Sequence, residues 1–555
     1  MEYRHVLTLI ALAAALGACD SGDIILSPTT VDNSTSTDNS STTTGAVEVE
    51  NPCATYTEAG QTFQGEHTDG NCVYDSLFVS DTRPITVSAI TFPALDNGGM
   101  HIFEDSLYIG EDVDSNAAAT GKRIPQEGEG TRLTIATGNT MVFEAQDSYV
   151  RIARGSQIFA EGTASNPIVF TSDEDAILDT ATESDRGQWG GLQINGNGRT
   201  NKCHDGTSTG SGSGASDFDP TSNNVHNCHV TAEGRPATYG GNNNAENSGA
   251  LRYVVIKHAG YEVVDGDELN ALTLNGVGSG TTISYVQTYT SQDDGFEMFG
   301  GAVNMDHIVA VNVGDDSIDY SEGYNGDIQY AVVVHTSGGN RCIEGDNTGG
   351  NRDDGFTPTT KLRISNLTCV TSNIDEGAGT NPSSKGDSEG PLYREGTFFE
   401  MYNSIVTSNA DGMASNECLE LHDTEGPQTG DAALNGTSRA SSNLIACTEP
   451  VKTNRDNFNV RDWLDGSVGT DNRNANNHVI DNLPMAMLLD GGVGTRAYRT
   501  LGSIQDSTGA AVTVSLFDAS SLGSIFGTPT YLGGASSGDD WLAGWAVGLD
   551  TQLVP

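Results

Sequence analysis

The chain has 555 residues, of which 75 are acidic and 26 basic, and its formal net charge is −49 at pH 7. This charge argues against nucleic acids and anionic membrane surfaces as partners, and it favours bound cations or a salty environment. The length alone suggests several domains, but a solenoid can reach it as one body because each repeat contacts only its neighbours.

The first segment, residues 1–19, has the features of a signal peptide rather than of folded structure. Arg4 precedes an apolar run, residues 6–16, that is too short to cross a bilayer. The run ends in Leu16-Gly17-Ala18-Cys19, which resembles the lipobox of bacterial lipoproteins. The resemblance implies that Cys19 is lipidated and becomes the mature N-terminus, with an ordinary signal peptide as the alternative.

The segment that follows, residues 20–50, is rich in Ser, Thr and Asn and has no apolar periodicity, so we expect a disordered tether. With a lipid as the only membrane contact, the protein would sit in the bacterial envelope, at the outer membrane or cell surface. Residues 51–130 are predicted to form an N-terminal cap and the first strands, because an open solenoid end needs a cover.

Residues 131–478 carry short β-type runs that repeat. Phe296-Glu297-Met298 and Ile318-Asp319-Tyr320 lie 22 residues apart, and in both an acid alternates with apolar neighbours. Period-2 alternation places the apolar residues on one face of a strand. A repeat of about 20 to 30 residues without helical periodicity indicates stacked coils. The predicted fold is an all-β, right-handed parallel β-helix with long loop excursions and terminal caps; a β-sandwich is the alternative.

Three Gly-, Ser- and Asn-rich stretches interrupt the pattern, at 197–247, 339–360 and 377–396, and are read as long loops of the kind that often carry function. Residues 479–555 end in a Gly-rich stretch with Trp541 and Trp545, which would suit a C-terminal cap packed on the last coil.

Several short sequence motifs together resemble those of a family of secreted or surface bacterial β-helix proteins found widely in aquatic bacteria. They are Gly187-Gln188-Trp189-Gly190-Gly191, the two acidic repeats and Asp540-Trp541-Leu542-Ala543-Gly544-Trp545. The resemblance covers most of residues 130–550. It implies a right-handed β-helix core and carries no reaction over to this chain.

Acidic residues are expected to stack on the outer face of the coils. At a spacing of about 4.8 Å, neighbouring carboxylates repel by about 3.5 kcal/mol at an effective dielectric of about 20, and calcium would relieve this because it takes oxygen ligands. The predicted calcium ligands are Glu297, Asp319, Glu344, Asp293, Asp294, Asp315 and Asp316. Asp375, Glu400 and Glu420 are further candidates for the same row. The alternative is a solvated acidic face with raised pKa values.

Apart from Cys19, the chain has eight cysteines, an even number that suggests disulfides in an exported protein. Pairing nearest neighbours gives Cys53–Cys72, Cys203–Cys228, Cys342–Cys369 and Cys418–Cys447. A zinc site is the alternative for the second pair, because His204, His226 and His229 lie beside it.

The sequence assigns no catalytic residue, since it holds no nucleophile elbow, phosphate loop or dinucleotide fingerprint. A non-enzymatic surface lipoprotein, binding glycans or another surface protein, is the favoured interpretation. A glycan lyase or hydrolase is the alternative, and periplasmic metal handling is a third possibility. A lyase would need a base, for which the candidates are Arg252, Lys257, Arg341, Arg352, Lys361 and Arg363. A basic pair facing the acidic row in a groove would favour the lyase.

Overall fold

The computed structural model describes residues 50–549 except 115–116, 118–120, 204–227, 236, 265–266, 336–338, 348–357, 373–385, 409–416, 425–427, 482–488, 491–498, 501–503, 506–509 and 537. The predictions for residues 1–49, including Cys19, therefore lie outside the described residues. All the elements below belong to the compact unit that begins at Asn51. No helix in the described part of the chain has both the length and the hydropathy that a membrane span requires.

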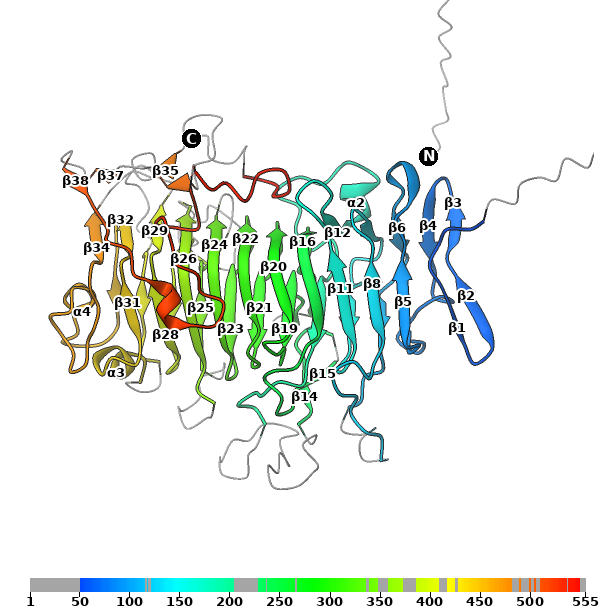
Figure 1. Ribbon diagram of the computed structural model, residues 1–555, viewed down its shortest axis with the longest axis horizontal. Helices are drawn as coiled ribbons and strands as arrows, with labels where there is room; N and C mark the ends of the chain where they lie inside the picture. Colours follow the sequence, from blue (N-terminus) through cyan, green and yellow to red (C-terminus); the bar gives the residue numbers. More distant parts are fainter. Residues whose placement is uncertain are drawn as a thin grey trace, which may run out of the picture. The chain divides into compact units, whose positions relative to one another are not determined.

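The first sheet is a single parallel ladder in which each strand pairs with the strand of the next coil (Figure 1). Its strands follow one another in chain order: β7 (Leu107–Ile109), β10 (Val150–Ile152), β13 (Leu192–Asn195), β19 (Leu272–Asn275), β21 (Phe296–Phe299), β23 (Ile318–Ser321), β25 (Glu344–Gly345), β27 (Leu392–Tyr393), β30 (Glu420–Leu421) and β33 (Lys452–Thr453). Strands that are parallel and consecutive in this way make a parallel β-helix, which confirms the predicted fold class.

The second sheet has 18 strands. They are β3 (Glu66–Thr68), β4 (Asn71–Tyr74), β5 (Ala89–Phe92), β6 (His101–Phe103), β8 (Arg132–Ile135), β9 (Thr140–Phe143), β11 (Gln157–Glu161), β12 (Ile168–Ser172), β16 (Gly249–Lys257), β20 (Thr282–Tyr289), β22 (Asn304–Val311), β24 (Asn325–Val334), β26 (Lys361–Thr371), β28 (Phe398–Tyr402), β29 (Ile405–Ser408), β31 (Arg439–Ser441), β32 (Leu444–Cys447) and β34 (His478–Asp481).

A corner divides the second sheet into two ladders. The first half of β16 pairs with β11 and its second half with β12, and the register skips Tyr253 between them. Residues at this corner have φ between 48° and 65°, a left-handed conformation that is uncommon outside glycine. They form what we call the corner column: Tyr253, Tyr285, His307, Tyr330, Asn366, Asn403 and Ser442.

The remaining elements are short. The strands are β1 (Thr55–Glu58), β2 (Gln61–Gln64), β14 (Val230–Thr231), β15 (Thr238–Tyr239), β17 (Glu262–Val264), β18 (Asp267–Glu268), β35 (Leu489–Asp490), β36 (Arg499–Thr500), β37 (Ile504–Gln505), β38 (Ala511–Val512) and β39 (Ala535–Ser536). The helices are η1 (Asp96–Gly98), α2 (Asp173–Ala176), α3 (Gln428–Leu434), α4 (Val460–Leu464) and η3 (Ala519–Leu522).

The interior of the coils is one apolar cluster, as the period-2 alternation requires. Toward the N-terminal end it contains a column of aromatic rings. Tyr74, Phe103, Phe143 and Trp189 stack with centroid separations of 4.9, 5.2 and 4.5 Å, one ring from each successive coil. Like residues therefore lie over like residues, which fixes the register of the coils and of the charged side chains outside them.

The described residues contain the four disulfides that nearest-neighbour pairing predicts. Cys342–Cys369 lies inside the coil and joins the first sheet to β26 of the second, and both cysteines are fully buried. Cys418–Cys447 makes the equivalent link two coils later, to β32. Both bridges cross the interior between the two sheets.

The C-terminal segment, residues 511–549, runs along the side of the coils (Figure 1, red). Phe517 stacks on Tyr402 of β28, and Trp545 packs edge-on against Tyr253 of β16. The sequence pattern suggested a cap packed on the last coil. The contacts of Phe517 and Trp545 are instead with the second sheet, and β39 pairs with β36.

Candidate functional site

The acidic row consists of Glu297, Asp319 and Glu344, which occupy equivalent positions in β21, β23 and β25. The register pairs Glu297 with Asp319 and Asp319 with Glu344. They point away from the apolar interior of the first sheet, because their neighbours Phe296, Ile318 and Tyr320 are buried in it. The sequence therefore placed these three side chains correctly relative to one another.

The aspartates at the preceding corner have a structural role as well. The Asp294 N–H donates to Oδ1 of Asn270 (3.1 Å), the Asp316 N–H donates to Oδ1 of Asp294 (2.9 Å), and the Arg341 N–H donates to Oδ1 of Asp316 (2.7 Å). Each side chain thus satisfies a backbone donor of the next coil. Asp294 and Asp316 each use one carboxylate oxygen in this way.

Carboxylate oxygens of the seven predicted ligands come together in three overlapping groups. Within each group the oxygens lie within 4.8 Å of one another. The groups are Asp293, Asp294 and Asp315; Asp294, Glu297 and Asp319; and Asp316, Asp319 and Glu344. Asp294 and Asp319 are shared between groups, so the oxygens form a continuous strip across three coils.

Ionising all the carboxyls of this strip at once would strongly destabilise the folded protein. Burial, together with neighbouring carboxylates, raises the pKa of Asp294, Glu297, Asp316 and Asp319 well above the ordinary values. Burial raises the pKa of Glu344 to about 7. Oδ1 of Asp319 is buried and has no hydrogen-bond partner among the described residues. Oxygen-rich groups of this kind fit a hard cation such as calcium, which would favour the ionised forms.

A pocket of about 520 Å³ continues the acidic row toward the C-terminal end of the first sheet. In register, Glu344 is followed by Leu392, then Glu420, then Lys452. The pocket is lined by Arg341, Leu392, Arg394, Glu395, Glu420, His422, Thr424 and Lys452. A pocket lined by basic residues and by carboxylates therefore adjoins the acidic row on one face.

Each cation of the pocket is held by carboxylates. Arg341 contacts Glu389 and lies 3.2 Å from Glu420. Arg394 links the pocket to the acidic row, with Nη2 at 2.7 Å from Oε2 of Glu344 and Nε at 2.8 Å from Oδ1 of Asp346.

Lys452 Nζ lies 2.7 Å from Oε1 of Glu417. Although burial opposes it, the hydrogen bond to Glu417 holds the pKa of Lys452 above its ordinary value. Although burial also disfavours the charged form of Arg394, its bonds to Asp346 raise the pKa of this guanidinium as well. Both side chains therefore remain protonated at neutral pH.

Two glutamates behind these cations, Glu389 and Glu417, have pKa values that are shifted in opposite directions. Burial, followed by a hydrogen bond with Glu417, raises the pKa of Glu389 to about 9. Although burial opposes it, the same bond and the one from Lys452 lower the pKa of Glu417. A protonated and an ionised carboxyl thus lie side by side, one against Arg341 and one against Lys452.

Sequence reasoning found Arg341 but missed Arg394 and Lys452. The other base candidates lie away from the pocket: Lys361 pairs with Glu400 and Arg363 with Asp327 on the second sheet, Lys257 pairs with Asp175, and Arg252 is in β16. Arg352 is outside the described residues. The alignment of Leu392 with Glu344 would have revealed Arg394, but a long excursion separates the two strands.

Of the further candidates for the row, only Glu420 is in it. The prediction that Glu400 belongs to the row is wrong. Glu400 lies in β28 of the second sheet, in register with Arg363 and Arg439. Its neighbours Phe399 and Met401 gave it the same alternation as Glu297, and alternation does not say which sheet a strand joins. Asp375 lies outside the described residues.

The zinc alternative does not fit the described residues. Cys203 and Cys228 are joined in a disulfide and so offer no thiolate. Nδ1 of His229 accepts a hydrogen bond from Arg154 at 3.0 Å, and burial, with the Arg154 charge, lowers the pKa of His229 to about 4. His204 and His226 are outside the described residues.

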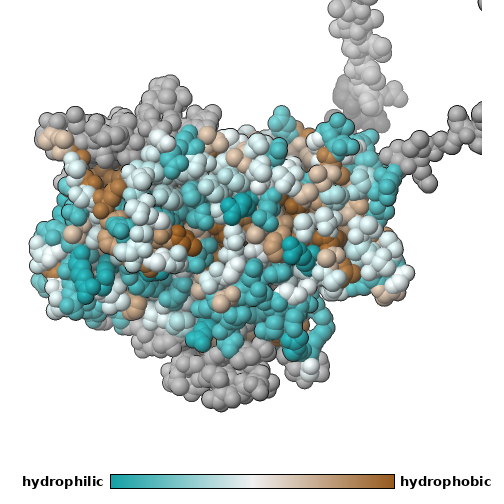
Figure 2. Space-filling view, in the orientation of Figure 1, coloured by the Kyte–Doolittle hydropathy of each residue, from teal (hydrophilic) through white to brown (hydrophobic). Residues whose placement is uncertain are grey.

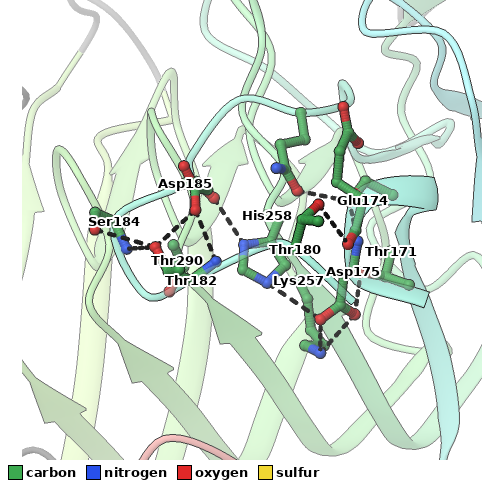
Figure 3. Close-up of polar contacts among 12 residues, drawn as sticks. Thr171, Glu174, Asp175, Thr180, Thr182, Ser184, Asp185, Lys257, His258 and Thr290 are labelled. Carbon is green, nitrogen blue, oxygen red and sulfur yellow. Dashed lines mark hydrogen bonds and ion pairs between the residues drawn. The ribbon is translucent and has the colours of Figure 1, made fainter. Parts of the chain in front are cut away.

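A second polar cluster lies beside α2 (Figure 3). Lys257 Nζ lies 2.6 Å from each carboxylate oxygen of Asp175. His258 Nδ1 donates to the Asp185 carbonyl at 2.7 Å, while Nε2 lies 3.5 Å from Oδ1 of Asp175. Both ring nitrogens are engaged and no hydroxyl lies against either, so the cluster fixes the 173–187 loop to β16.

Residues 120–480, nearly two thirds of the chain, match the family described as the pectate-lyase-like beta helix domain. The match begins within the first coils and ends at β34, so it covers the acidic row and the pocket. The family's name points to proteins related to glycans. No curated protein and no solved structure matches the chain.

Proposed function

Because the chain belongs to the pectate-lyase-like beta helix family, we propose that it binds acidic glycans on the outer face of the first sheet, with calcium held by the acidic row. The observation that carries this proposal is the continuity of the acidic row with the pocket. A chain of uronates could be held through calcium at one end and by arginine at the other. Arginine suits this task because it carries five N–H donors, and the bonds of Arg394 to Glu344 and Asp346 use its Nε and Nη2.

Two features support binding rather than catalysis. A lyase base must lose its proton before it can take one from the sugar, and a base works best with a pKa near the operating pH. Here carboxylates raise the pKa of Lys452 and Arg394, although burial opposes this. The second feature is that Arg341, Arg394 and Lys452 are all paired, so they are arranged as fixed cations.

A glycan-active enzyme is the second candidate function, and two features favour it. One is the set of basic residues in a pocket beside the acidic row, which the sequence pattern made the sign of a lyase. The other is the Glu389–Glu417 pair. Neighbouring carboxyls whose pKa values are pushed apart are candidates for a general acid and a general base. Each contacts a cation that lines the pocket.

The proposal also covers where the protein is located in the cell. The Leu16-Gly17-Ala18-Cys19 motif and the Ser-, Thr- and Asn-rich residues 20–50 support a lipid anchor at Cys19 with a tether. The folded body would then face the envelope or the cell exterior, at the outer membrane or cell surface. Mass spectrometry of the membrane-extracted protein would detect a lipid on Cys19, and an unmodified Cys19 would overturn this part.

The binding test compares polygalacturonate fragments with neutral glucan fragments, in calcium and in chelator. We expect calcium-dependent binding of the acidic fragments only, with at least a tenfold loss in Arg394→Ala. Arg363→Ala is the matched control, because it also removes a carboxylate-paired arginine but on the second sheet. Equal losses in the two variants, or no binding of acidic fragments, would overturn the proposal.

The same incubations separate binding from cleavage. A lyase produces unsaturated uronates that absorb in the ultraviolet, and a hydrolase produces new reducing ends without that absorbance. Bound fragments that remain intact support the binding role. Cleavage that is lost in Glu389→Gln would establish the second candidate instead.

A further inference from the structure

The outer face of the second sheet, beyond the corner, is apolar and covered by the C-terminal segment. Val255, Val309, Val332 and Val370 lie on β16, β22, β24 and β26 of this face and are buried. They form one cluster with residues of the segment, namely Leu532, Ala535, Leu542, Trp545 and Leu549. With the segment in place, hydrophobic residues on the visible surface form scattered patches rather than a continuous stripe (Figure 2).

Aromatic side chains of the corner column form the edge of this face. Tyr253, Tyr285, His307 and Tyr330 stack with centroid separations of 4.5, 4.4 and 4.9 Å. The segment places its own rings against them. Trp545 packs edge-on against Tyr253 at 5.7 Å, Trp541 packs edge-on against His307 at 4.9 Å, and Tyr531 lies 5.7 Å from Tyr330.

Side-chain amides of the coils recognise the backbone of the segment. Gln287 donates to the carbonyl of Val547 and accepts from its N–H, both at 2.8 Å. Gln329 makes the same two-way pair with Gly527 at 3.2 and 2.7 Å, and Asn403 makes it with Phe517 at 3.0 and 2.8 Å.

A two-way amide pair reproduces what a neighbouring strand offers to an extended peptide. The three pairs join residues that are 260, 198 and 114 positions apart in the chain. Nothing in these contacts requires the segment and the coils to belong to the same molecule, because none is made between neighbours in sequence.

We propose that this face is a peptide-binding groove whose resident ligand is the chain's own C-terminal segment, and that the same segment of a second copy can take its place. Exchange of identical segments reproduces the contacts between the segment and the coils, and the segment of the same molecule has only the advantage of effective concentration. β36 and β37 precede the segment and pair with its strands β39 and β38, so they would move with it. The 17 residues 482–498 before β36 span up to about 60 Å when extended, which allows the segment to reach a neighbouring copy. This inference is independent of the proposed glycan site.

The first test weakens the packing of the chain's own C-terminal segment and adds a competing peptide of the same sequence. A fluorescent synthetic peptide of residues 511–549 is added to the full chain carrying Trp541→Ala and Trp545→Ala. We expect saturable binding to this variant, at least tenfold tighter than to the wild type, whose groove is filled. A peptide with Leu516→Ala should bind equally well, because Leu516 is exposed, and a peptide with both tryptophans replaced should not bind.

The groove itself is tested by adding Gln287→Ala, Gln329→Ala and Asn403→Ala to the loosened chain. Loss of peptide binding supports the proposal. Unchanged binding, or no binding to a loosened chain that still melts cooperatively, overturns it.

A second measurement needs no destabilising change. Isotopically heavy and light full chains, each with a photo-crosslinking phenylalanine analogue in place of Leu516, are mixed, concentrated, incubated and irradiated. Crosslinks between heavy and light chains that join the segment to the second sheet support exchange. Crosslinks confined to single chains, at every concentration, overturn it.

Discussion

Two rows of charged side chains run along this protein, one on each sheet. In both rows charged groups stack at one per coil, but the rows differ in how those charges are compensated. The acidic row stacks Glu297, Asp319 and Glu344 on the first sheet. The alternating row stacks Asp327, Arg363, Glu400 and Arg439 on the second. Both have one charge per coil at the same strand spacing, so the order of signs is what differs.

The alternating row neutralises itself. Arg363 donates from Nε and Nη2 to the two oxygens of Asp327, both at 2.6 Å. Although burial opposes it, hydrogen bonds from Lys361 and Tyr402 lower the pKa of Glu400. In the acidic row burial and like charges raise every pKa. Carboxyls in such a row must bind protons or a cation, which is why we assign ligand binding to this face.

The largest expected effect comes from supplying the cation. Under the proposed function calcium binds the folded acidic row and not the unfolded chain, so at a free concentration of about 1,000 times its Kd it should stabilise the fold by about 4 kcal/mol for each site. Thermal unfolding in calcium and in chelator measures this shift. The triple change Glu297→Gln, Asp319→Asn and Glu344→Gln should abolish it, whereas Arg363→Ala should keep it. An equal midpoint with and without calcium would contradict the calcium assignment.

The pH dependence should also distinguish the rows. Carboxyls with a raised pKa hold protons in the folded state that the unfolded chain has already lost, so their stability is present below about pH 4 and is lost as pH rises through the folded pKa. For Glu344 that pKa is about 7. In chelator, the free energy of unfolding should therefore fall by about 3 kcal/mol between pH 5 and pH 8. Urea titrations measure it, and calcium should flatten the dependence.

Breaking the alternating row should be costly. Arg363→Ala leaves Asp327, which is 5% exposed, beside Glu400 with no cation between them. We expect a loss of about 2 kcal/mol in the free energy of unfolding, since an unpaired, partly buried carboxylate remains. Adding Asp327→Ala should recover part of the loss. A double variant less stable than Arg363→Ala would show that charge pairing is not the cause.

The smallest effect has the opposite sign. In chelator at pH 8, Asp319→Asn removes one repelling charge from the acidic row and should stabilise the fold by about 1 kcal/mol. The same variant in calcium should be less stable than the wild type, because it loses a ligand. A change of sign between the two buffers is the expected result, and chemical unfolding in each measures it.

The sequence predicted the acidic row because its first coils are regular. Glu297 and Asp319 are 22 residues apart, Asp319 and Glu344 are 25 apart, and each directly follows an apolar residue. From Glu344 to Leu392 the step is 48 residues, because a long excursion intervenes. The strands beyond it are only two residues long. Alternation has no meaning over two residues, so Arg394 and Lys452 could not be aligned with the row.

The sequence could not predict the path of the C-terminal segment, and the reason is a different one. Its partners Gln287, Gln329 and Asn403 are single amides within strands, and nothing in the local pattern marks them as peptide-binding. Tyr253, Tyr285 and His307 look like ordinary strand residues until the left-handed corner turns them outward together. The cysteines were easier, because nearest neighbours along the chain are also neighbours within one coil.

The two interior disulfides have a mechanical consequence. When a solenoid is pulled from its ends, coils peel away and their backbone bonds break a rung at a time. Cys342–Cys369 and Cys418–Cys447 each close part of one coil into a covalent ring, and the bridged cysteines are 27 and 29 positions apart in the sequence. Under oxidising conditions each ring withholds about 90 to 100 Å of contour length from the extending chain, and reduction releases it. The oxidised protein should therefore be the shorter and stiffer of the two under tension.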